Sequence, residues 1–129
     1  LARTTRRDGG TCIDEPEVRD RLVGFAIDAM ALRFSGQRAR IPGLVADRPL
    51  ALPLMSKVAG TEYAQAVADF GCELQGYAGT LNKGDTAAVA EGEWQRAYLN
   101  SYAGTIAGGT SEIVRNILGE KVLGLPKTK

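Results

Sequence analysis

Apolar side chains recur at helical spacing over a first segment, which runs from about residue 14 to residue 37. Asp14 and Pro16 open this segment, because an acidic N-cap and a proline in the first turn are typical of a helix start. Two apolar stripes follow, one of Val18, Leu22, Phe25, Ala29 and Leu32, the other of Val23, Ala26, Met30 and Phe34. Two stripes predict a helix that is packed on both sides inside a bundle.

Three further segments have the same periodicity and cover approximately residues 49–75, 91–102 and 110–122. Glycines follow the second segment from Gly76 onward, and Thr110 or Ser111 is the expected N-cap of the last. Strand signals are weak throughout. The sequence therefore predicts an all-α protein, an up-and-down helical bundle with moderately short connections, in a single domain over residues 1–129.

The segment from Leu1 to Arg7 has neither a starting Met nor the apolar centre of a signal peptide. It is interpreted as the last turns of a helix that begins upstream, and the chain as a piece of a longer protein. On this interpretation Arg3, Arg6 and Arg7 form a solvated helix end rather than a binding patch.

The amino-acid composition limits the partners and the catalytic groups that the chain can use. Apolar residues make up 44%, charged residues 24%, and the net charge is +1, so nothing points to nucleic acid or a membrane, and we expect a cytoplasmic protein. Cys12 and Cys72 are interpreted as reduced thiols, and no spacing predicts a metal site. The chain has no histidine, which excludes Ser-His and Cys-His nucleophiles within it. Chemistry here must use carboxylates, tyrosine, lysine or a cofactor.

One stretch, residues 104–117, combines paired glycines with a new helix that starts Thr-Ser-Glu. Glycines let the backbone approach a ligand closely, and the first N–H groups of a helix bind oxygens or phosphates. An ordinary helix–helix turn with a polar cap has the same pattern, so the pattern alone leaves both interpretations open. A phosphate loop is excluded although Gly104 and Gly109 have suitable spacing, because the lysine is missing and a helix precedes the glycines.

Residues 108–117, followed by 119–126, resemble the C-terminal signature of acyl-CoA dehydrogenases. The run 94–99, Trp-Gln-Arg-Ala-Tyr-Leu, is similar to the form in actinobacterial and mycobacterial members, and Met55-Ser56-Lys57 resembles the family's small-residue-Lys element. The resemblance runs from about Pro16 to Pro126. It implies the C-terminal helical bundle, without its first helix, of a three-domain enzyme that also has an N-terminal helical and a middle β domain.

The resemblance also implies a reaction. The full-length protein would be an FAD-dependent oxidoreductase that converts an acyl-CoA to its trans-2-enoyl-CoA, in the breakdown of fatty acids or sterol side chains. In the family, a glutamate takes the α-proton and the flavin takes the β-hydride. Implied partners are an electron-transfer flavoprotein or similar acceptor, and further subunits of a homo- or hetero-oligomer, as a dimer or tetramer. We expect the 129-residue chain alone to be inactive, and to self-associate through uncovered apolar faces.

Carried over by position, Gly109 would lie against the substrate, and three residues would approach the FAD: Thr110, Ser111 and Glu112. The family's second helix usually ends Gln-x-x-Gly-Gly and contacts the FAD of a neighbouring subunit. Here Glu73 stands in place of the glutamine, Gly76 is kept, and Tyr77 replaces the second glycine. Glu73 is therefore either a cofactor contact or a solvated helix residue.

The position of the catalytic glutamate in many family members is Gly108 in this chain, so no catalytic residue is predicted here. Either the base comes from the preceding helix, or this chain is a non-catalytic partner subunit, a helical assembly module, of a heteromeric enzyme. Glu112 lies in the first turn of a helix, which favours a dipole-stabilising carboxylate over a base. The aromatic stripe of Trp94, Tyr98 and Tyr102 is interpreted as packing rather than ligand stacking.

Overall fold

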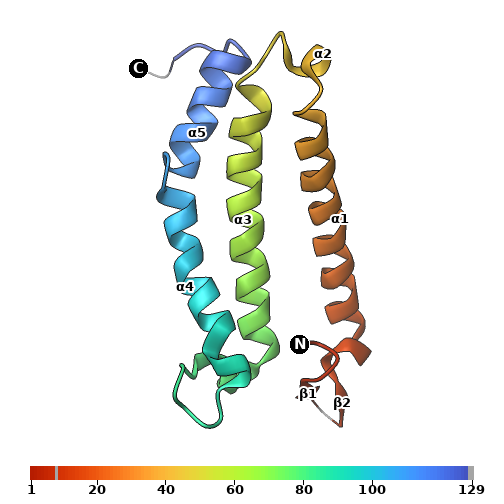
Figure 1. The fold of residues 1–129 in the computed structure, drawn as a ribbon. Helices are drawn as coiled ribbons and strands as arrows, with labels where there is room; N and C mark the ends of the chain where they lie inside the picture. Colours follow the sequence, from red (N-terminus) through yellow and green to blue (C-terminus); the bar gives the residue numbers. More distant parts are fainter. Residues whose placement is uncertain (8, 128–129) are drawn as a thin grey trace.

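The central element of the fold is helix α3 (Ala51–Leu74), which has helix α1 (Pro16–Arg38) on one side and helices α4 (Glu93–Ile106) and α5 (Ser111–Ile117) on the other (Figure 1). The computed structural model describes residues 1–7 and 9–127. The shorter elements are β1 (Arg6–Arg7), β2 (Gly10–Thr11), α2 (Pro42–Val45), the 3-10 helices η1 (Cys12–Asp14), η2 (Gly76–Thr80) and η3 (Val89–Gly92), and the π-helical turn η4 (Leu118–Val122). The predicted all-α bundle is confirmed.

The start of α1 differs from the prediction in one detail. Glu15 is the N-cap and makes no side-chain capping bond, while Pro16 lies in the first turn as expected. The carboxylate of Asp14 turns back instead and accepts hydrogen bonds from the backbone N–H (2.9 Å) and hydroxyl (2.7 Å) of Thr11. Asp14 therefore stabilises the turn before α1 and does not cap the helix itself.

The predicted helix end at residues 1–7 is wrong. The first residues form a turn, in which the backbone N–H groups of Thr4 and Thr5 donate to the carbonyl of Leu1, and β1 then pairs antiparallel with β2. Gly9, in a left-handed conformation (φ +85°), turns the chain between the two strands. Arg7 is also not simply solvated, because its guanidinium reaches Glu15 at 3.2 Å and donates to the carbonyl of Glu73.

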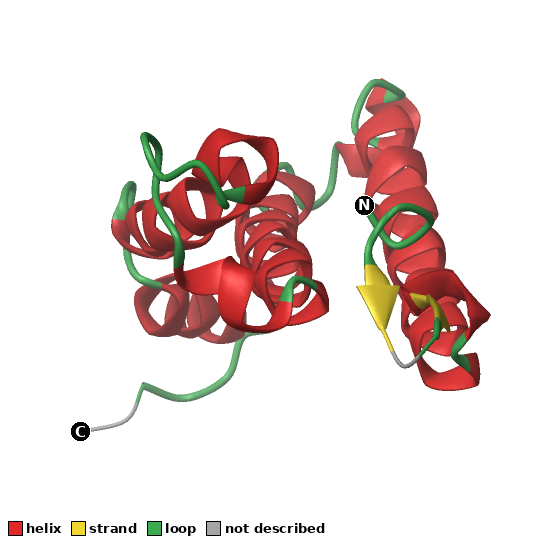
Figure 2. Cartoon of the chain, turned by 90° about the horizontal axis from the view of Figure 1, so that it is seen from below, coloured by secondary structure: helices red, strands yellow, loops and turns green. Residues whose placement is uncertain are grey.

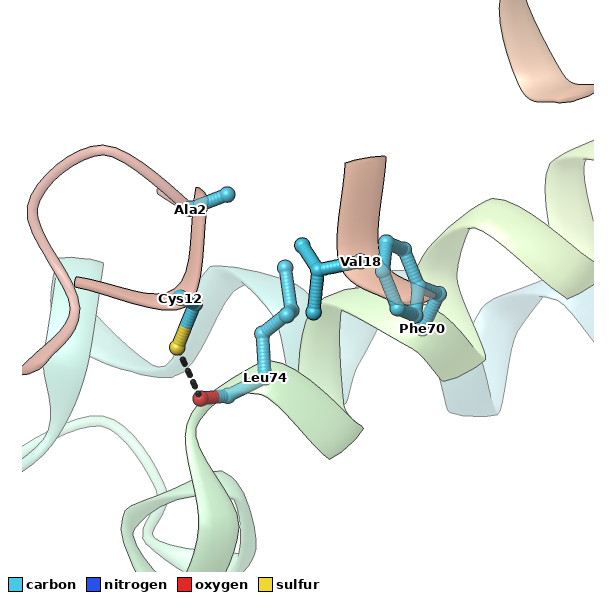
Figure 3. Close-up of a cluster of buried hydrophobic side chains, with 5 residues drawn as sticks. All are labelled: Ala2, Cys12, Val18, Phe70 and Leu74. Carbon is cyan, nitrogen blue, oxygen red and sulfur yellow. Dashed lines mark hydrogen bonds between the residues drawn. The ribbon is translucent and has the colours of Figure 1, made fainter. Parts of the chain in front are cut away.

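The largest buried cluster joins this N-terminal segment to the lower parts of α1 and α3 (Figure 3). It consists of Ala2, Cys12, Val18, Phe70 and Leu74. The Cys12 thiol is fully buried and donates to the carbonyl of Leu74 at 3.7 Å. Both cysteines are free thiols, as expected from the sequence. The N-terminal segment thus packs against one end of the α1–α3 interface through Ala2 and Cys12.

On the other side of α3, small residues allow α4 to pack closely. A Cβ at Gly71 would overlap the indole ring of Trp94, and a Cβ at Gly104 would meet the Thr61 methyl at 3.5 Å. Helix α4 begins later than predicted, because Ala90 and Glu91 have left-handed backbone conformations (φ 48° and 53°) that place the helix start at Glu93. It also ends later than predicted, at Ile106.

Helix α1 is packed on one side only. Figure 2 shows it at one side of the bundle, and it packs on α3 through Val18, Phe25 and their neighbours. The second predicted stripe lies in solvent, with Val23, Met30 and Phe34 each more than half exposed. The prediction of a helix packed on both sides is therefore wrong for the described structure, in which only the first stripe is packed. Across the described residues, no helix has both the length and the apolar character needed to span a membrane.

Candidate functional site

The candidate site is the turn between α4 and α5. After Ala107 ends α4, Gly108 and Gly109 both have positive φ angles (70° and 105°), and Thr110 then caps α5 by accepting a hydrogen bond from the backbone N–H of Ile113 at 3.3 Å. The two left-handed residues reverse the backbone within a short span, which glycine does with little strain. The predicted cap at Thr110 is confirmed.

Lys57 on α3 holds this turn in place. Its ammonium donates to the carbonyl of Gly109 at 2.6 Å and to the carbonyl of Thr105 at 3.2 Å. The second carbonyl belongs to the last turn of α4, where unpaired carbonyls carry partial negative charge. Lys57 thus joins the end of α4, the glycine pair and α3 through one charge. Sequence reasoning found the Met-Ser-Lys element but missed this role.

Two further contacts fix α5 against α3. Val114 is 1% exposed and is the apolar anchor of the short helix. One nitrogen of the Arg115 guanidinium donates to both carboxylate oxygens of Glu62 at 2.7 Å. Both partners are partly exposed, with side-chain exposures of 53% and 39%, so the ion pair contributes modestly and is screened by salt.

The hydroxyl of Ser111 has an unusual environment. Ser111 is buried, and its Oγ has no hydrogen-bond partner within the described chain. An unpaired buried hydroxyl costs about 1–3 kcal/mol. Thr110 and Ser111 therefore differ in function: the first completes the helix cap, and the second keeps an unused donor.

Glu112 is exposed in the first turn of α5, and its pKa is held below the ordinary value. The main cause is a hydrogen bond from its own backbone N–H, followed by one from the Thr110 hydroxyl, with Arg115 and Lys57 as nearby positive charges. A lowered pKa makes a carboxylate a weaker proton acceptor. The geometry favours the interpretation of Glu112 as a structural carboxylate at the helix start rather than a base.

Gly108 faces open space. No atom lies within 4 Å of the position that a Cβ would occupy, so the absence of a side chain leaves room beside the turn. Its φ of 70° nevertheless favours glycine over residues with a side chain. The position therefore supplies no proton acceptor.

Glu73 and Gly76 lie elsewhere. Glu73 is near the C-terminal end of α3, 16 residues beyond Lys57, which corresponds to ~24 Å along a helix at 1.5 Å per residue. Gly76 follows in η2. The Glu73 carboxylate pairs with Arg21 at 2.5 Å and is 56% exposed, Gly76 has a φ of 56°, and Tyr77 is 97% exposed. The predicted site residues thus form two groups, at opposite ends of α3.

Two buried amides near that lower end were missed by the sequence analysis. Gln75 donates to the carbonyl of Gly71 at 2.8 Å, and Gln95 donates to the carbonyl of Ala78 at 3.0 Å. The Oε1 atom of each has no hydrogen-bond partner among the described residues. Nothing in the local pattern distinguishes these glutamines from solvated ones, because their burial depends on how η2 folds over α3 and α4.

The aromatic stripe on α4 packs within the chain. Trp94 lies on Gly71, and the rings of Tyr98 and Tyr102 meet edge to face at 5.4 Å, with their hydroxyls 2.8 Å apart. The pKa of Tyr98 is raised to about 12, and the largest cause is the hydrogen bond with the Tyr102 hydroxyl. The structure favours packing over ligand stacking for this stripe.

Comparison with known proteins defines the class. Residues 1–123 match the family model described as acyl-CoA dehydrogenase, C-terminal domain. The chain therefore belongs to the acyl-CoA dehydrogenase family, as the resemblance in its last third indicated.

Individual relatives agree with the family. The chain is 34% identical to acyl-CoA dehydrogenase IpdE1 of Mycolicibacterium smegmatis, over 98% of this chain and 30% of that protein. It is also 34% identical to IpdE1 of Mycobacterium tuberculosis, over 88% of this chain and 28% of that protein. The chain thus spans about a third of the length of the curated relatives it matches.

Solved structures support the fold. The ChsE4-ChsE5 complex from Mycobacterium tuberculosis matches with a TM-score of 0.80 and 27% identity, over 98% of this chain and 33% of that one. The Tcur3481-Tcur3483 steroid ACAD matches with a TM-score of 0.77 over 90% of this chain and 30% of that one; its identity of 23% supports the fold alone.

Proposed function

We propose that this chain is the C-terminal domain of an FAD-dependent acyl-CoA dehydrogenase that oxidises an acyl-CoA to its trans-2-enoyl-CoA. One observation carries the proposal: in a chain of this family, the signature turn of Gly108 and Gly109 is held by Lys57 and leaves Ser111 with an unused donor. Open space beside Gly108 adds room for a ligand. These features fit an oxygen-rich cofactor at the start of α5.

The residues proposed to hold FAD are Thr110, Ser111 and Glu112, with the substrate acyl chain or thioester against Gly109. The chemistry that FAD supplies is acceptance of the β-hydride. Within this chain, Lys57 orients the turn, and the Ser111 hydroxyl donates to the cofactor. Since Gly108 has no side chain and Glu112 is a weakened base, the proton acceptor for the α-carbon comes from residues outside this chain.

The two groups of site residues suggest how subunits share the site. Glu73 lies ~24 Å along α3 from Lys57, at 1.5 Å rise per residue, and Gly76 lies beyond the end of α3, so one flavin ring system is not expected to contact both ends within one chain. We infer that Gly76, and Glu73 if it releases Arg21, face the cofactor of a neighbouring subunit. The ChsE4-ChsE5 complex, which the chain resembles, contains two kinds of chain, and this supports an oligomer of like or unlike subunits.

The experiment is to purify the complete protein and record its visible absorbance, and then to follow acyl-CoA-dependent reduction of an electron acceptor, with an electron-transfer flavoprotein as the natural candidate. A yellow protein that is bleached by acyl-CoA is the expected result. A yellow protein that no acyl-CoA reduces would contradict the proposed reaction. The 129-residue chain alone is expected to be inactive, because it has no proton acceptor at the turn.

A second candidate is supported by Gly108 itself. A chain without a base at this position could serve as the non-catalytic subunit of a heteromeric enzyme. A colourless protein that co-purifies with a flavin-containing partner would favour this candidate over the first. Acyl chain length, and the choice between a fatty acid and a sterol side chain, would then be measured on the assembled enzyme.

A further inference from the structure

Lys57 places a positive charge without a carboxylate partner directly behind the candidate turn. Its half-buried ammonium is held by two backbone carbonyls, that of Gly109 at 2.6 Å and that of Thr105 at 3.2 Å. No ion pair within the described residues involves this ammonium. Carbonyl oxygens carry only partial negative charge, so the two hydrogen bonds fix the position of the ammonium without cancelling its charge.

The other cation close to the turn, Arg115, is neutralised within the chain. Its guanidinium donates to both carboxylate oxygens of Glu62 at 2.7 Å, and both side chains are partly exposed, so water and salt screen the pair. Lys57 is therefore a stronger source of positive potential at the turn than Arg115.

The hydrogen bond from Lys57 also sets the direction of one backbone donor. The described residues contain no cis peptide bond, so the Thr110 N–H points opposite to the Gly109 carbonyl in the plane of their shared peptide. Since that carbonyl points to Lys57, the Thr110 N–H points away from Lys57, and no backbone group of the described chain accepts it. A hydrogen bond at the carbonyl of a peptide polarises the group and strengthens its N–H as a donor.

The potential of Lys57 extends to the first turn of α5. The pKa of Glu112 there is lowered, first by a hydrogen bond from its own backbone N–H, then by one from the Thr110 hydroxyl, and further by the charges of Arg115 and Lys57. An electron-rich group of a ligand bound at this turn would be stabilised by the same potential.

The proposed reaction adds negative charge to the cofactor. The α-carbon gives its proton to a base outside this chain, and the β-hydrogen leaves with both electrons of its bond. Acceptance of this hydride adds one negative charge to FAD, until the two electrons pass to the electron acceptor. A fixed positive charge near the cofactor therefore stabilises the reduced form more than the oxidised form.

We propose that Lys57 is a positioning residue that favours the reduced cofactor, because it supplies an uncompensated positive charge behind the turn and fixes the outward direction of the Thr110 N–H. This role rests on the proposed function, since it requires FAD at the α4–α5 turn. It differs from a purely structural role, in which Lys57 would hold the turn together and leave the redox equilibrium of the flavin unchanged.

The test is the two-electron reduction potential of the flavin in the complete, flavin-loaded protein, measured against a reference dye. Lys57→Met should make reduction about tenfold less favourable, which corresponds to a potential ~30 mV lower for a two-electron couple. Lys57→Gln can still donate to a carbonyl but lacks the charge, so its potential should fall as well. Lys57→Arg keeps the charge and should stay close to the wild type.

Lys83→Met is the matched control, because it removes the same charge from an exposed lysine in the loop between η2 and η3. Its potential should equal that of the wild type. For a variant that releases its flavin, the ratio of the dissociation constants of oxidised and reduced FAD gives the same equilibrium.

Two results would overturn the role of Lys57 while leaving the proposed function intact. One is a flavin that acyl-CoA reduces and whose potential is the same in the wild type, Lys57→Met and Lys57→Gln. The other is a fall in Lys57→Arg as large as that in Lys57→Met, which would show that geometry and not charge is responsible. A complete protein whose flavin no acyl-CoA reduces would instead overturn the proposed function, and this role with it.

Discussion

The two ends of α3 are held by different kinds of contact. At the C-terminal end, Phe70 and Leu74 are buried with Cys12 and Val18 in an apolar cluster. In the N-terminal half, Lys57 adds polar contacts to the buried apolar side chains of Val58 and Val114, because it binds backbone carbonyls of the α4–α5 turn. Burial of apolar surface contributes a large free energy and depends little on orientation. A hydrogen bond fixes the relative positions of two groups but adds little net stability. We therefore expect the apolar cluster at the C-terminal end of α3 to contribute more to the stability of the fold. We expect Lys57, in the N-terminal half, to fix the geometry of the candidate site.

The largest effect is expected from breaking the apolar end. Phe70 is 4% exposed, and the centre of its ring lies 5.5 Å from the centre of the Phe25 ring. Phe70→Ala should lower the free energy of unfolding by about 3–5 kcal/mol. Urea unfolding followed by circular dichroism measures this loss. Leu99→Ala, at an exposed position of α4, is the control and should change stability little. Equal effects of the two variants would show that the lower cluster is not the stabilising core.

The next effect concerns the polar end. Lys57→Met keeps the length of the side chain but leaves the carbonyls of Thr105 and Gly109 without their donor, at a cost of about 1–3 kcal/mol. Hydrogen exchange should rise at residues 105–113 and stay unchanged around Leu74. Lys57→Arg, which keeps the charge, should recover part of the protection. Uniform acceleration of exchange along the chain would contradict a local role for Lys57.

A smaller effect is expected from the ion pair between Glu62 and Arg115. Glu62→Gln should cost about 0.2–1 kcal/mol, because both side chains are partly exposed. The difference from wild type should shrink when urea unfolding is repeated at high salt. A difference that persists at high salt would mean that this pair is more deeply shielded than its exposure indicates.

The smallest effect depends on pH. Hydrogen bonds from the Thr11 backbone and hydroxyl lower the pKa of Asp14 from its ordinary 3.8. The ionised carboxylate therefore stabilises the folded chain above about pH 4, and this contribution is lost as the pH falls through the lowered pKa. Thermal unfolding of Asp14→Asn should show a flatter dependence on acid pH than wild type. An unchanged acid profile would contradict the assigned hydrogen bonds.

Helical periodicity predicted the main helices because each buries a face of its own residues. It failed at residues 1–7, where seven residues are too few to show a period, and where the burial of Ala2 and Cys12 depends on α1 and α3 together. The glycine pair and the Thr110 cap were found because capping is local. Lys57 was not understood from sequence, since the two carbonyls it binds lie 48 and 52 residues further along the chain.

The separation of Glu73 from the α4–α5 turn is also a product of the fold. The resemblance left Glu73 as either a contact to the FAD of a neighbouring subunit or a solvated residue, and the sequence holds no information on how far α3 keeps it from the turn. The same is true of the two apolar stripes on α1: periodicity shows both, but only the packed structure shows which one α3 covers.

The proposed function requires that the α4–α5 turn bind the flavin with the Ser111 hydroxyl as a donor. The most direct test is the dissociation constant of FAD for the complete protein, compared between Ser111→Ala and Ser101→Ala, a control serine on α4 that donates to the carbonyl of Tyr98. Ser111→Ala is expected to weaken FAD binding about tenfold while leaving the stability of the cofactor-free protein unchanged or higher, since it removes an unpaired buried hydroxyl. Equal affinity of the two variants for FAD would contradict the account.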